Sequence, residues 1–298
     1  MKLNRFGFIV ILIFLSFSFC ISEAKILIVH DMEEETTLKI VEGLKTEVKD
    51  EFFLLTTASG NDKIKENKTD YVIALGSDAY KICSENLTDS KLFYAMISNP
   101  FNLKTSANTI GGIAFEPDPD FFFNTLKKVF PKASKIGVAY VPDTSQKIID
   151  KFTSSASKYN LTIVTEKVDS SAKIPIALKT LPDKCDILWG GPDDSVFTQA
   201  NLQIFAQTSF SKKLPLVFNS RSNAEKGGTI SIIGEYNNVG LLLGKMINEY
   251  KSSGSVSEKI KFPVKTVIVV NMKMIGQLQL ALPSEVLQPG PNIIIIFK

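Results

Sequence analysis

The sequence predicts an α/β protein with two similar lobes, each built on an open parallel sheet flanked by helices. Short apolar runs that end in Gly, Pro, Asp or Ser recur along the chain, which is typical of strands buried on both faces. Segments with helical spacing separate these runs, and this alternation indicates βαβ units. The order of elements in the first half is echoed in the second, as 70–78 and 186–194 illustrate. Two such halves predict a hinged ligand cleft between them.

The first half alternates strand and helix from Lys25 onward. Leu38, Val41, Leu44 and Val48 recur at helical spacing, which predicts a helix over 34–49. We also expect strands at 25–29, 52–55, 71–75 and 92–97, helical segments at 61–68 and from 78 to about 85, and an extended crossover at 109–115.

The second half follows the same scheme, and its most informative stretch is 185–221. An apolar strand there breaks at Gly190-Gly191-Pro192, a helical run follows, and a second strand opens into Asn219-Ser220-Arg221. In parallel sheets the loops after the carboxyl ends of the strands build the ligand crevice. We expect strands at 136–140, 161–168, 185–189, 214–218, 229–233, 264–270 and 293–297, and helices at 118–129, 145–158, 174–181, 238–251 and 272–280.

The two lobes are expected to share the chain unequally. Residues 25–116 should form the N-terminal lobe, completed by about 236–262. Residues 117–235 should form the C-terminal lobe, completed by about 263–298. The strand at the end of the chain has no obvious place in this division.

Composition indicates a globular protein with no large basic face. Of the 298 residues, 44% are hydrophobic and 22% are charged. The formal net charge is +3, and it falls to +2 when Lys2, Arg5 and Glu23 are removed with the N-terminal segment. This near balance argues against nucleic acid as a partner.

The first 24 residues have the pattern of a signal peptide. Lys2 and Arg5 form a basic region, 6–19 is apolar but short for a membrane span, and 22–24 carries small residues at the cleavage positions. We therefore expect export to the periplasm or cell surface, with cleavage after Ala24. Lipid attachment at Cys20 is the alternative. The mature chain would keep Cys83 and Cys185, expected as two buried free thiols because they fall in different halves.

Known catalytic and cofactor motifs are absent from the sequence. There is no G-x-G-x-x-G, G-x-x-x-x-G-K-[ST], G-x-S-x-G or H-E-x-x-H segment. With the single histidine His30 and two separated cysteines, a His/Cys metal site cannot be assembled. We therefore expect neither an enzyme nor a cofactor. Asp193-Asp194 could be a carboxylate pair, although such pairs are common in turns.

Two rare side chains stand at strand ends of the second half and are expected to face the cleft. Arg221 is the only arginine besides Arg5, and a guanidinium grips a carboxylate with two parallel bonds, which lysine cannot do. A surface role in a loop is its alternative. Trp189 is the only tryptophan and would stack on a flat or apolar ligand, unless it belongs to the core.

The first half offers polar candidates at its own strand ends. His30 lines either the cleft or a sheet edge. Ser77 and Asp78 open a helix, where they act as an N-cap or leave amides that hold an anionic group. Glu235 and Asp31 are the acids best placed for a ligand ammonium.

Several segments resemble one known family. They are 73–79, 98–100, 131–140, 235–240, 244–246, Asn271 and Leu282-Pro283, of which 131–140 is the most specific. Over 25 to about 283 the chain resembles the solute-binding proteins of ABC importers, in the family whose characterised members take tryptophan or tyrosine. This sequence departs from the family at Asn99, where Asp is usual, and at Gln279, where Gly is usual.

The resemblance implies two lobes of the periplasmic-binding protein type I class, joined by three crossovers and closing on a ligand by a hinge. It also implies a cleft lined from positions near Ser77, Asn99, Tyr140, Asp194, Ser220 and Glu235. Together with the candidates above, the expected ligand-binding residues are His30, Asp31, Gly76, Ser77, Asp78, Ser98, Asn99, Tyr140, Trp189, Asp194, Ser220, Arg221 and Glu235.

These observations predict an exported, monomeric solute-binding protein. It would capture a small amino-acid-like ligand, aromatic ones included, and hand it to the membrane permease of an ABC importer. The ligand carboxylate would bind Arg221 or helix-start amides near Ser77, and Trp189 or Tyr140 would supply aromatic packing. The alternatives are a ligand-sensing module of the same fold and an exported two-lobed enzyme.

Overall fold

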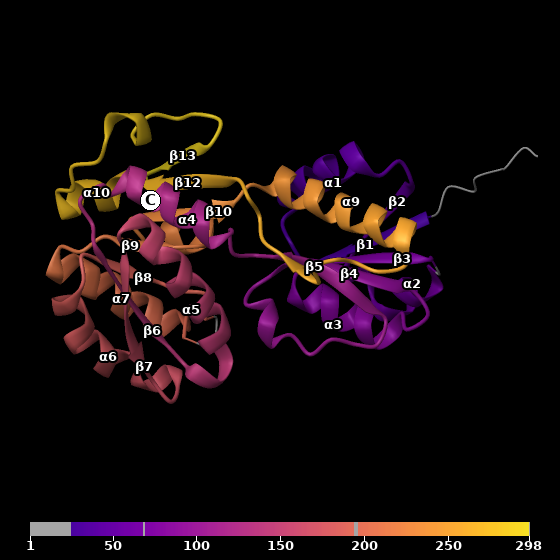
Figure 1. The fold of residues 1–298 in the computed structure, drawn as a ribbon, viewed down its shortest axis with the longest axis horizontal. Coiled ribbons are helices and arrows are strands. Elements are labelled where there is room, and N and C mark those ends of the chain that lie inside the picture. The colour runs from indigo at the N-terminus through magenta and orange to yellow at the C-terminus, as the bar shows by residue number, and fades with distance from the viewer. Residues whose placement is uncertain (1–24, 68, 194–195, 298) are drawn as a thin grey trace, which may run out of the picture.

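The structure, a computed structural model, describes residues 25–67, 69–193 and 196–297. The predicted signal peptide and Cys20 lie outside these residues, as does Asp194. Figure 1 shows two lobes side by side, each a sheet with helices on both faces.

The first lobe is built on a six-stranded sheet in the order β11-β5-β4-β3-β1-β2, and all of its paired strands are parallel. Helices α1 and α9 cover one face, and α2 and α3 cover the other (Figure 1). The strands are β1 (Lys25–His30), β2 (Glu51–Thr56), β3 (Tyr71–Leu75), β4 (Lys91–Ile97), β5 (Thr109–Ala114) and β11 (Ile260–Lys261). The helices are α1 (Glu34–Glu47), α2 (Asn61–Glu66), α3 (Ser77–Asn86) and α9 (Tyr236–Ser253).

The second lobe is built on a seven-stranded sheet in the order β13-β12-β10-β9-β8-β6-β7. Its helices α4, α5 and α10 pack on one face, and α6 and α7 on the other. The strands are β6 (Lys135–Tyr140), β7 (Thr162–Lys167), β8 (Ile187–Trp189), β9 (Leu216–Phe218), β10 (Ile230–Gly234), β12 (Thr266–Asn271) and β13 (Ile293–Ile296). The helices are α4 (Pro119–Val129), α5 (Pro142–Ala156), α6 (Ile174–Thr180), α7 (Gln199–Lys212), α8 (Arg221–Glu225) and α10 (Met272–Leu278).

The predicted fold class is confirmed, with local differences. Strand β12 runs antiparallel to β10, so the second sheet is mixed. The segment expected as an extended crossover is strand β5, which pairs with both β4 and β11. Helix α10 ends at Leu278, two residues earlier than expected, because Gln279 adopts a left-handed conformation (φ 54°).

The chain passes between the lobes three times, at 115–118, 235 and 262–265. These segments are hydrogen-bonded to one another. The Asp118 amide donates to the Pro263 carbonyl at 2.8 Å, and the Glu235 amide donates to the Lys265 carbonyl at 3.0 Å. The Asn238 carboxamide oxygen accepts two further amides from the third segment. The three crossover segments therefore form one hydrogen-bonded bundle that joins the lobes, and they do not act as three independent linkers.

Helices α1 and α9 approach so closely that two glycines are required. A Cβ atom built on Gly240 would lie 1.9 Å from the Ile40 carbonyl oxygen, and one on Gly43 would lie 2.0 Å from the Asn237 carbonyl oxygen. Backbone atoms cannot move aside as a flexible side chain can. Glycine at these positions lets the two helices pack backbone against backbone above the first sheet.

We expect Gly240→Ala to lower the free energy of unfolding by about 1–3 kcal/mol, because the added methyl group overpacks the α1–α9 contact. Urea unfolding followed by circular dichroism measures this change. Gly276→Ala in α10 is the matched control, since no neighbouring atom lies within 4 Å of its Cβ position. That substitution should stabilise the protein by roughly 0.5–1 kcal/mol. Equal effects of the two substitutions would contradict the packing argument.

Glu249 on α9 anchors the loop that leads to β11 and the third crossover. Its carboxylate accepts a hydrogen bond from the Ser257 amide at 2.5 Å and forms an ion pair with Lys261 at 3.2 Å. Hydrogen bonds from the Ser257 side chain and amide, and then from Lys261, lower the pKa of Glu249 to about 2.

A carboxyl group whose pKa is lowered on folding stabilises the folded state above its ordinary pKa, and this contribution disappears as pH falls through the folded value. We therefore expect Glu249→Gln to lower the urea midpoint at pH 6, and this difference from wild type to shrink from about pH 4.5 and vanish near pH 2. The neighbouring, exposed Glu258→Gln variant is the control and should match wild type at pH 6. A difference that persists at pH 2 would assign the effect to something other than this carboxylate.

Candidate functional site

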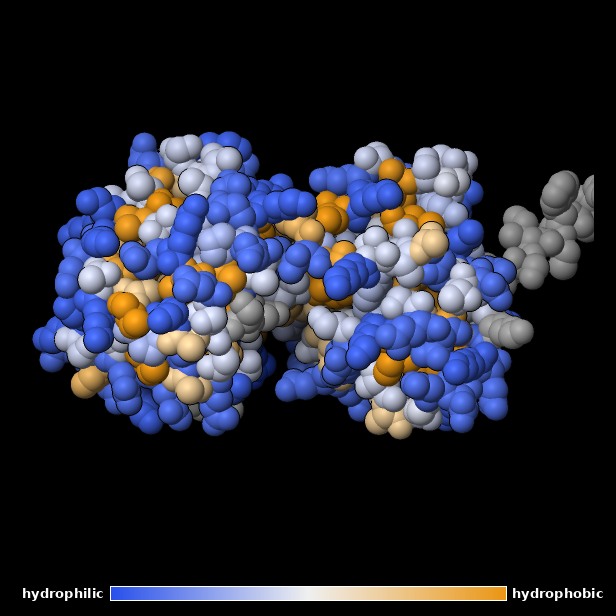
Figure 2. Space-filling view, turned by 90° about the horizontal axis from the view of Figure 1, so that it is seen from below, coloured by the Kyte–Doolittle hydropathy of each residue, from blue (hydrophilic) through white to orange (hydrophobic). Residues whose placement is uncertain are grey.

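Loops at the carboxyl ends of the parallel strands of both sheets face one another across a cleft, together with the amino ends of β12 and β13. In the space-filling view of Figure 2 a notch separates the two lobes below their junction. Two pockets lie in this region, and each is lined by residues from both lobes. We name them the Arg221 pocket and the Asn99 pocket.

The Arg221 pocket has a volume of about 690 Å³, which is in the range for a small-molecule site. The start of α1 contributes Glu33 and Thr36 from the first lobe, and the start of α8 contributes Arg221 from the second. Charged side chains of both signs line it together with apolar ones. The lining residues are Met32, Glu33, Glu35, Thr36, Lys39, Phe115, Ser220, Arg221, Ser222, Glu225, Ile233, Gly234, Glu235, Tyr236, Asn237, Val267, Pro291 and Ile294.

Arg221 retains donors for a ligand in this pocket. Its Nε atom pairs with Glu225 at 3.3 Å, one turn along α8, and 49% of its side chain is exposed. Its charge extends across the cleft: the pKa of Glu35 is lowered mainly by Lys39 and also by Arg221. A second acid, Glu235, is 30% exposed and 3.9 Å from Lys265. A guanidinium and a carboxylate thus line one pocket, which suits a zwitterion.

Tyr236 gives the Arg221 pocket an aromatic surface. It is the first residue of α9 and packs against a second-lobe cluster that contains Ala224, Ile233 and Val269. Burial raises the pKa of its hydroxyl group, while a hydrogen bond with Thr36 and the charge of Arg221 act in the opposite direction. The ring therefore lies at the junction of both lobes.

The Asn99 pocket is smaller, about 250 Å³, and its key residue bridges the lobes. The Asn99 side-chain amide nitrogen donates to the Thr144 carbonyl oxygen of the second lobe at 2.6 Å and to the Ser145 hydroxyl at 3.2 Å. The Asn99 Oδ1 atom is buried and has no donor among the residues that the structure describes. The residues lining this pocket are Ser77, Ile97, Ser98, Asn99, Asn102, Leu103, Thr144 and Asp193.

Local backbone geometry sets the position of Asn99. Met96 has φ 63° at an irregularity in the β4–β5 pairing, and Asn99 itself is left-handed (φ 45°), a conformation that asparagine tolerates well. The buried Glu116 carboxylate accepts from the Ser98 hydroxyl at 2.7 Å and from the Asn99 amide at 3.0 Å. These contacts tie the loop to the first crossover.

Three first-lobe candidates form one structural contact. The Asp31 carboxylate accepts the amides of Asp78 and Ala79 at 2.9 and 3.3 Å, so the start of α3 is already bonded to an anion. We expected the backbone amides near Ser77 to hold an anionic group of the ligand. For the Asp78 and Ala79 amides this expectation is wrong, because both already donate to Asp31. Gly76 permits the contact, because its Cβ position would lie 1.8 Å from the Asp31 side chain. Ser77 itself lines the Asn99 pocket.

His30 is a satisfied side chain next to this contact. It is 7% exposed, and its Nδ1 atom is 3.1 Å from the Thr37 hydroxyl and 3.2 Å from the Met32 carbonyl oxygen. Among the remaining candidates, Ser98 and Asn99 line the Asn99 pocket, and Ser220, Arg221 and Glu235 line the Arg221 pocket. Their assignment to a ligand stays a prediction, and Asp194 lies outside the described residues.

Trp189 and Tyr140 do not face the cleft, and this expectation is wrong. Trp189 is fully buried, and its ring centroid lies 4.9 Å from that of Phe152 and 5.3 Å from that of Phe122. Its indole nitrogen donates to the Asn219 side-chain oxygen at 3.0 Å. Tyr140 is 1% exposed and donates to Gln146 at 2.7 Å. Both rings belong to the packing of the second lobe. Asp193 accepts the Val141 amide at 2.8 Å.

As the only tryptophan, Trp189 reports directly on this placement. We expect blue-shifted emission from the native protein and little quenching by iodide, because water and ions do not reach a fully buried ring. The same protein in guanidinium chloride is the control and should be quenched readily. Strong iodide quenching of the native protein would place the ring in the cleft after all.

The two thiols are poor nucleophiles. Neither is in a disulfide, as expected; Cys83 is buried and Cys185 is half-buried, not fully buried as predicted. Burial raises the pKa of Cys83 to about 12 and is the main cause that raises that of Cys185 to about 11. In the described ranges no group of three His, Cys, Asp or Glu side chains is placed to hold a metal ion. None of the helices in those ranges is long and apolar enough to cross a membrane.

The pocket-lining residues that the sequence did not indicate include Phe115, Thr144, Tyr236 and Ile294. Thr144 and Tyr236 lie four and three residues after the ends of predicted strands (136–140 and 229–233), so their positions carried a usable signal. Phe115 and Ile294 come from a crossover and from the last strand, whose places in the fold no local pattern reveals.

Comparison with known proteins agrees with this architecture. The chain is 22% identical over 228 residues to a tyrosine-binding protein of Clostridioides difficile (strain R20291), a match over 72% of this chain and 65% of that relative's length. A Streptococcus pneumoniae ABC domain solved in complex with L-Trp superposes with a TM-score of 0.59 at 21% identity, covering 92% of this chain and all of that one. The ligand-free, open form of a Clostridium difficile substrate-binding protein with adhesive properties superposes with a TM-score of 0.60 at 21% identity. This match covers 92% of this chain and 99% of that one.

The structural neighbours establish the periplasmic-binding protein type I-like fold. The sequence match is broader than any single motif: residues 25–293 match the model of the family described as ABC transporter substrate binding protein. The chain belongs to this family of substrate-binding proteins.

Proposed function

We propose that this protein is exported and captures an amino acid with a large side chain in the cleft between its lobes, for delivery to the permease of an ABC importer. The Arg221 pocket is the observation that carries this proposal. It is lined from both lobes and combines one arginine, a nearby acid and the aromatic ring of Tyr236. These are the groups that a carboxylate, an ammonium and an apolar side chain require.

The roles within this pocket follow from the contacts. Arg221 would bind the ligand carboxylate and Glu235 the ammonium group, because the other candidate acid, Asp31, is bonded to the start of α3. Tyr236 replaces Trp189 and Tyr140 as the aromatic contact. Ser77, Ser98 and Asn99 would complete the cleft on the side of the Asn99 pocket.

Two further observations support the ligand class and the location. A similar protein is named for tyrosine binding, and a similar structure contains L-Trp. The N-terminal segment with Lys2, Arg5 and an apolar run has the pattern of an export signal, which supports action outside the cytoplasm.

The proposal is tested by isothermal titration calorimetry of residues 25–298 against the twenty amino acids and a set of other small metabolites. We expect saturable binding of one or a few amino acids with large side chains. Absence of heat and of thermal stabilisation for every compound would leave the fold without this function.

Arg221→Lys should weaken binding of the best amino acid at least about tenfold, because the ammonium group loses the two-point contact with the carboxylate. Lys226→Ala, which removes a cation just after α8 and outside the pocket, is the control and should stay within about twofold of wild type. Wild-type affinity of Arg221→Lys would move the carboxylate to another part of the cleft.

A further inference from the structure

The last strand of the chain completes the wall of the Arg221 pocket. Strand β13 lies at the edge of the second sheet and pairs in parallel with β12, with Ile294 opposite Val269. The parallel register brings Pro291 and Ile294 to the end of the sheet that faces the first lobe, and both line the pocket. The family match ends at residue 293, so Ile294 lies just beyond it.

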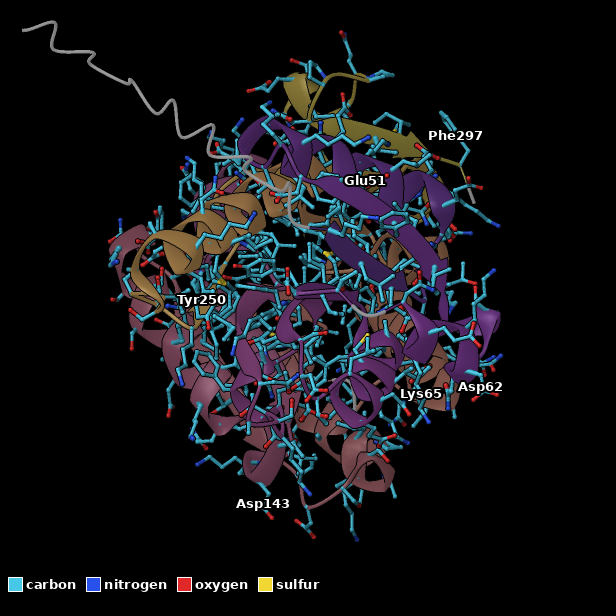
Figure 3. All side chains as sticks on the ribbon, turned by 90° about the vertical axis from the view of Figure 1, so that its right-hand side faces the viewer. Glu51, Asp62, Lys65, Asp143, Tyr250 and Phe297 are labelled. Atoms are coloured by element: carbon cyan, nitrogen blue, oxygen red, sulfur yellow. The ribbon has the colours of Figure 1, made fainter. Side chains whose placement is uncertain are left out.

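Side chains of β13 alternate between two different environments. Ile294 and Ile296 pack with Ala224, Ile233 and Val269, on the side of α8. Ile293 and Ile295 pack on the opposite face, in the core that contains Ile275 of α10. Phe297 follows the strand and points outward, 76% exposed (Figure 3). Four similar residues in a row therefore have distinct roles set by the period of two.

Ile294 is only partly buried, so its side chain has surface left for a ligand. Its apolar neighbours in the pocket are Val267 from β12 and Tyr236 from α9. The same pocket carries Arg221 and Glu235. The Arg221 pocket thus has charged groups for the polar part of a zwitterion and an apolar wall for its side chain.

We propose that Ile294 is a specificity-determining residue that contacts the side chain of the bound amino acid. This inference rests on the proposed function of the Arg221 pocket. A branched aliphatic group at this wall favours ligands with large apolar side chains, because each methylene group that fits an apolar pocket adds affinity and polar groups there lose hydrogen bonds to water. The C-terminal strand would then supply part of the wall of the binding site.

The experiment compares Ile294→Ala with Ile295→Ala, which removes the same atoms from the same strand on the opposite face. Calorimetry measures the affinity of each variant for the best-binding amino acid and for alanine. We expect Ile294→Ala to lower the affinity for the large ligand about fivefold to tenfold, with the alanine affinity unchanged. Ile295→Ala should stay within about twofold for both ligands. Melting temperatures of both variants show whether their loss of stability is matched.

Two further variants, one that removes less of the side chain and one that enlarges it, keep the test decisive if Ile294→Ala does not fold. Ile294→Val should weaken binding of the large ligand about twofold to threefold, and Ile294→Trp should shift preference toward smaller side chains by filling the pocket. Equal effects of changes at 294 and 295 would overturn the inference while wild-type binding still upheld the proposed function. A wild-type protein that binds no amino acid would overturn both.

Discussion

The whole architecture depends on how the chain passes between its two sheets. Each passage is only a few residues long, so the ends of the two sheets that these passages connect must lie close to one another. Hydrogen bonds from Asp118 to Pro263 and from Glu235 to Lys265 join the passages side by side. Gly234 adds to this closeness, because its Cβ position would lie 2.7 Å from the Pro263 ring. Because the bundle holds these ends together, the cleft between the lobes is bounded by strand ends.

The bundle also explains why the Arg221 pocket lies where it does. The second passage leads from β10 through Glu235 directly into Tyr236 and α9, so one short segment carries both an acid and a ring into the junction. Helix α1 lies against α9 through Gly43 and Gly240, and this contact brings the start of α1, with Glu33 and Thr36, to the same place. Packing inside the first lobe thus positions one wall of the pocket, and α8 and β13 position the other.

Much of the fold was predictable because strands buried on both faces leave an unmistakable apolar pattern. The direction and the pairing of the strands were not predictable. The apolar run that forms β12 looks the same whether the strand is parallel or antiparallel to its neighbour, and β11 is too short, at two residues, to leave a pattern. For the site, the sequence located strand ends but not the side to which each side chain points. Trp189 and Arg221 both stand at strand ends, yet one is enclosed by Phe122 and Phe152 and the other lines the pocket.

Asn99 bridges the two lobes with a hydrogen bond whose net contribution to their contact is small. Its hydrogen bond to the Thr144 carbonyl contributes about 0.5–1.5 kcal/mol net, whereas a buried acceptor such as its Oδ1 atom, left without a donor, costs about 1–3 kcal/mol. These contributions are similar in size and opposite in sign, so this bridge adds little net stabilisation to the contact between the lobes. A ligand shifts an equilibrium between conformations only through contacts that differ between them. In the proposed function, a ligand that contacts both walls of the Arg221 pocket would supply the free energy that favours the closed state.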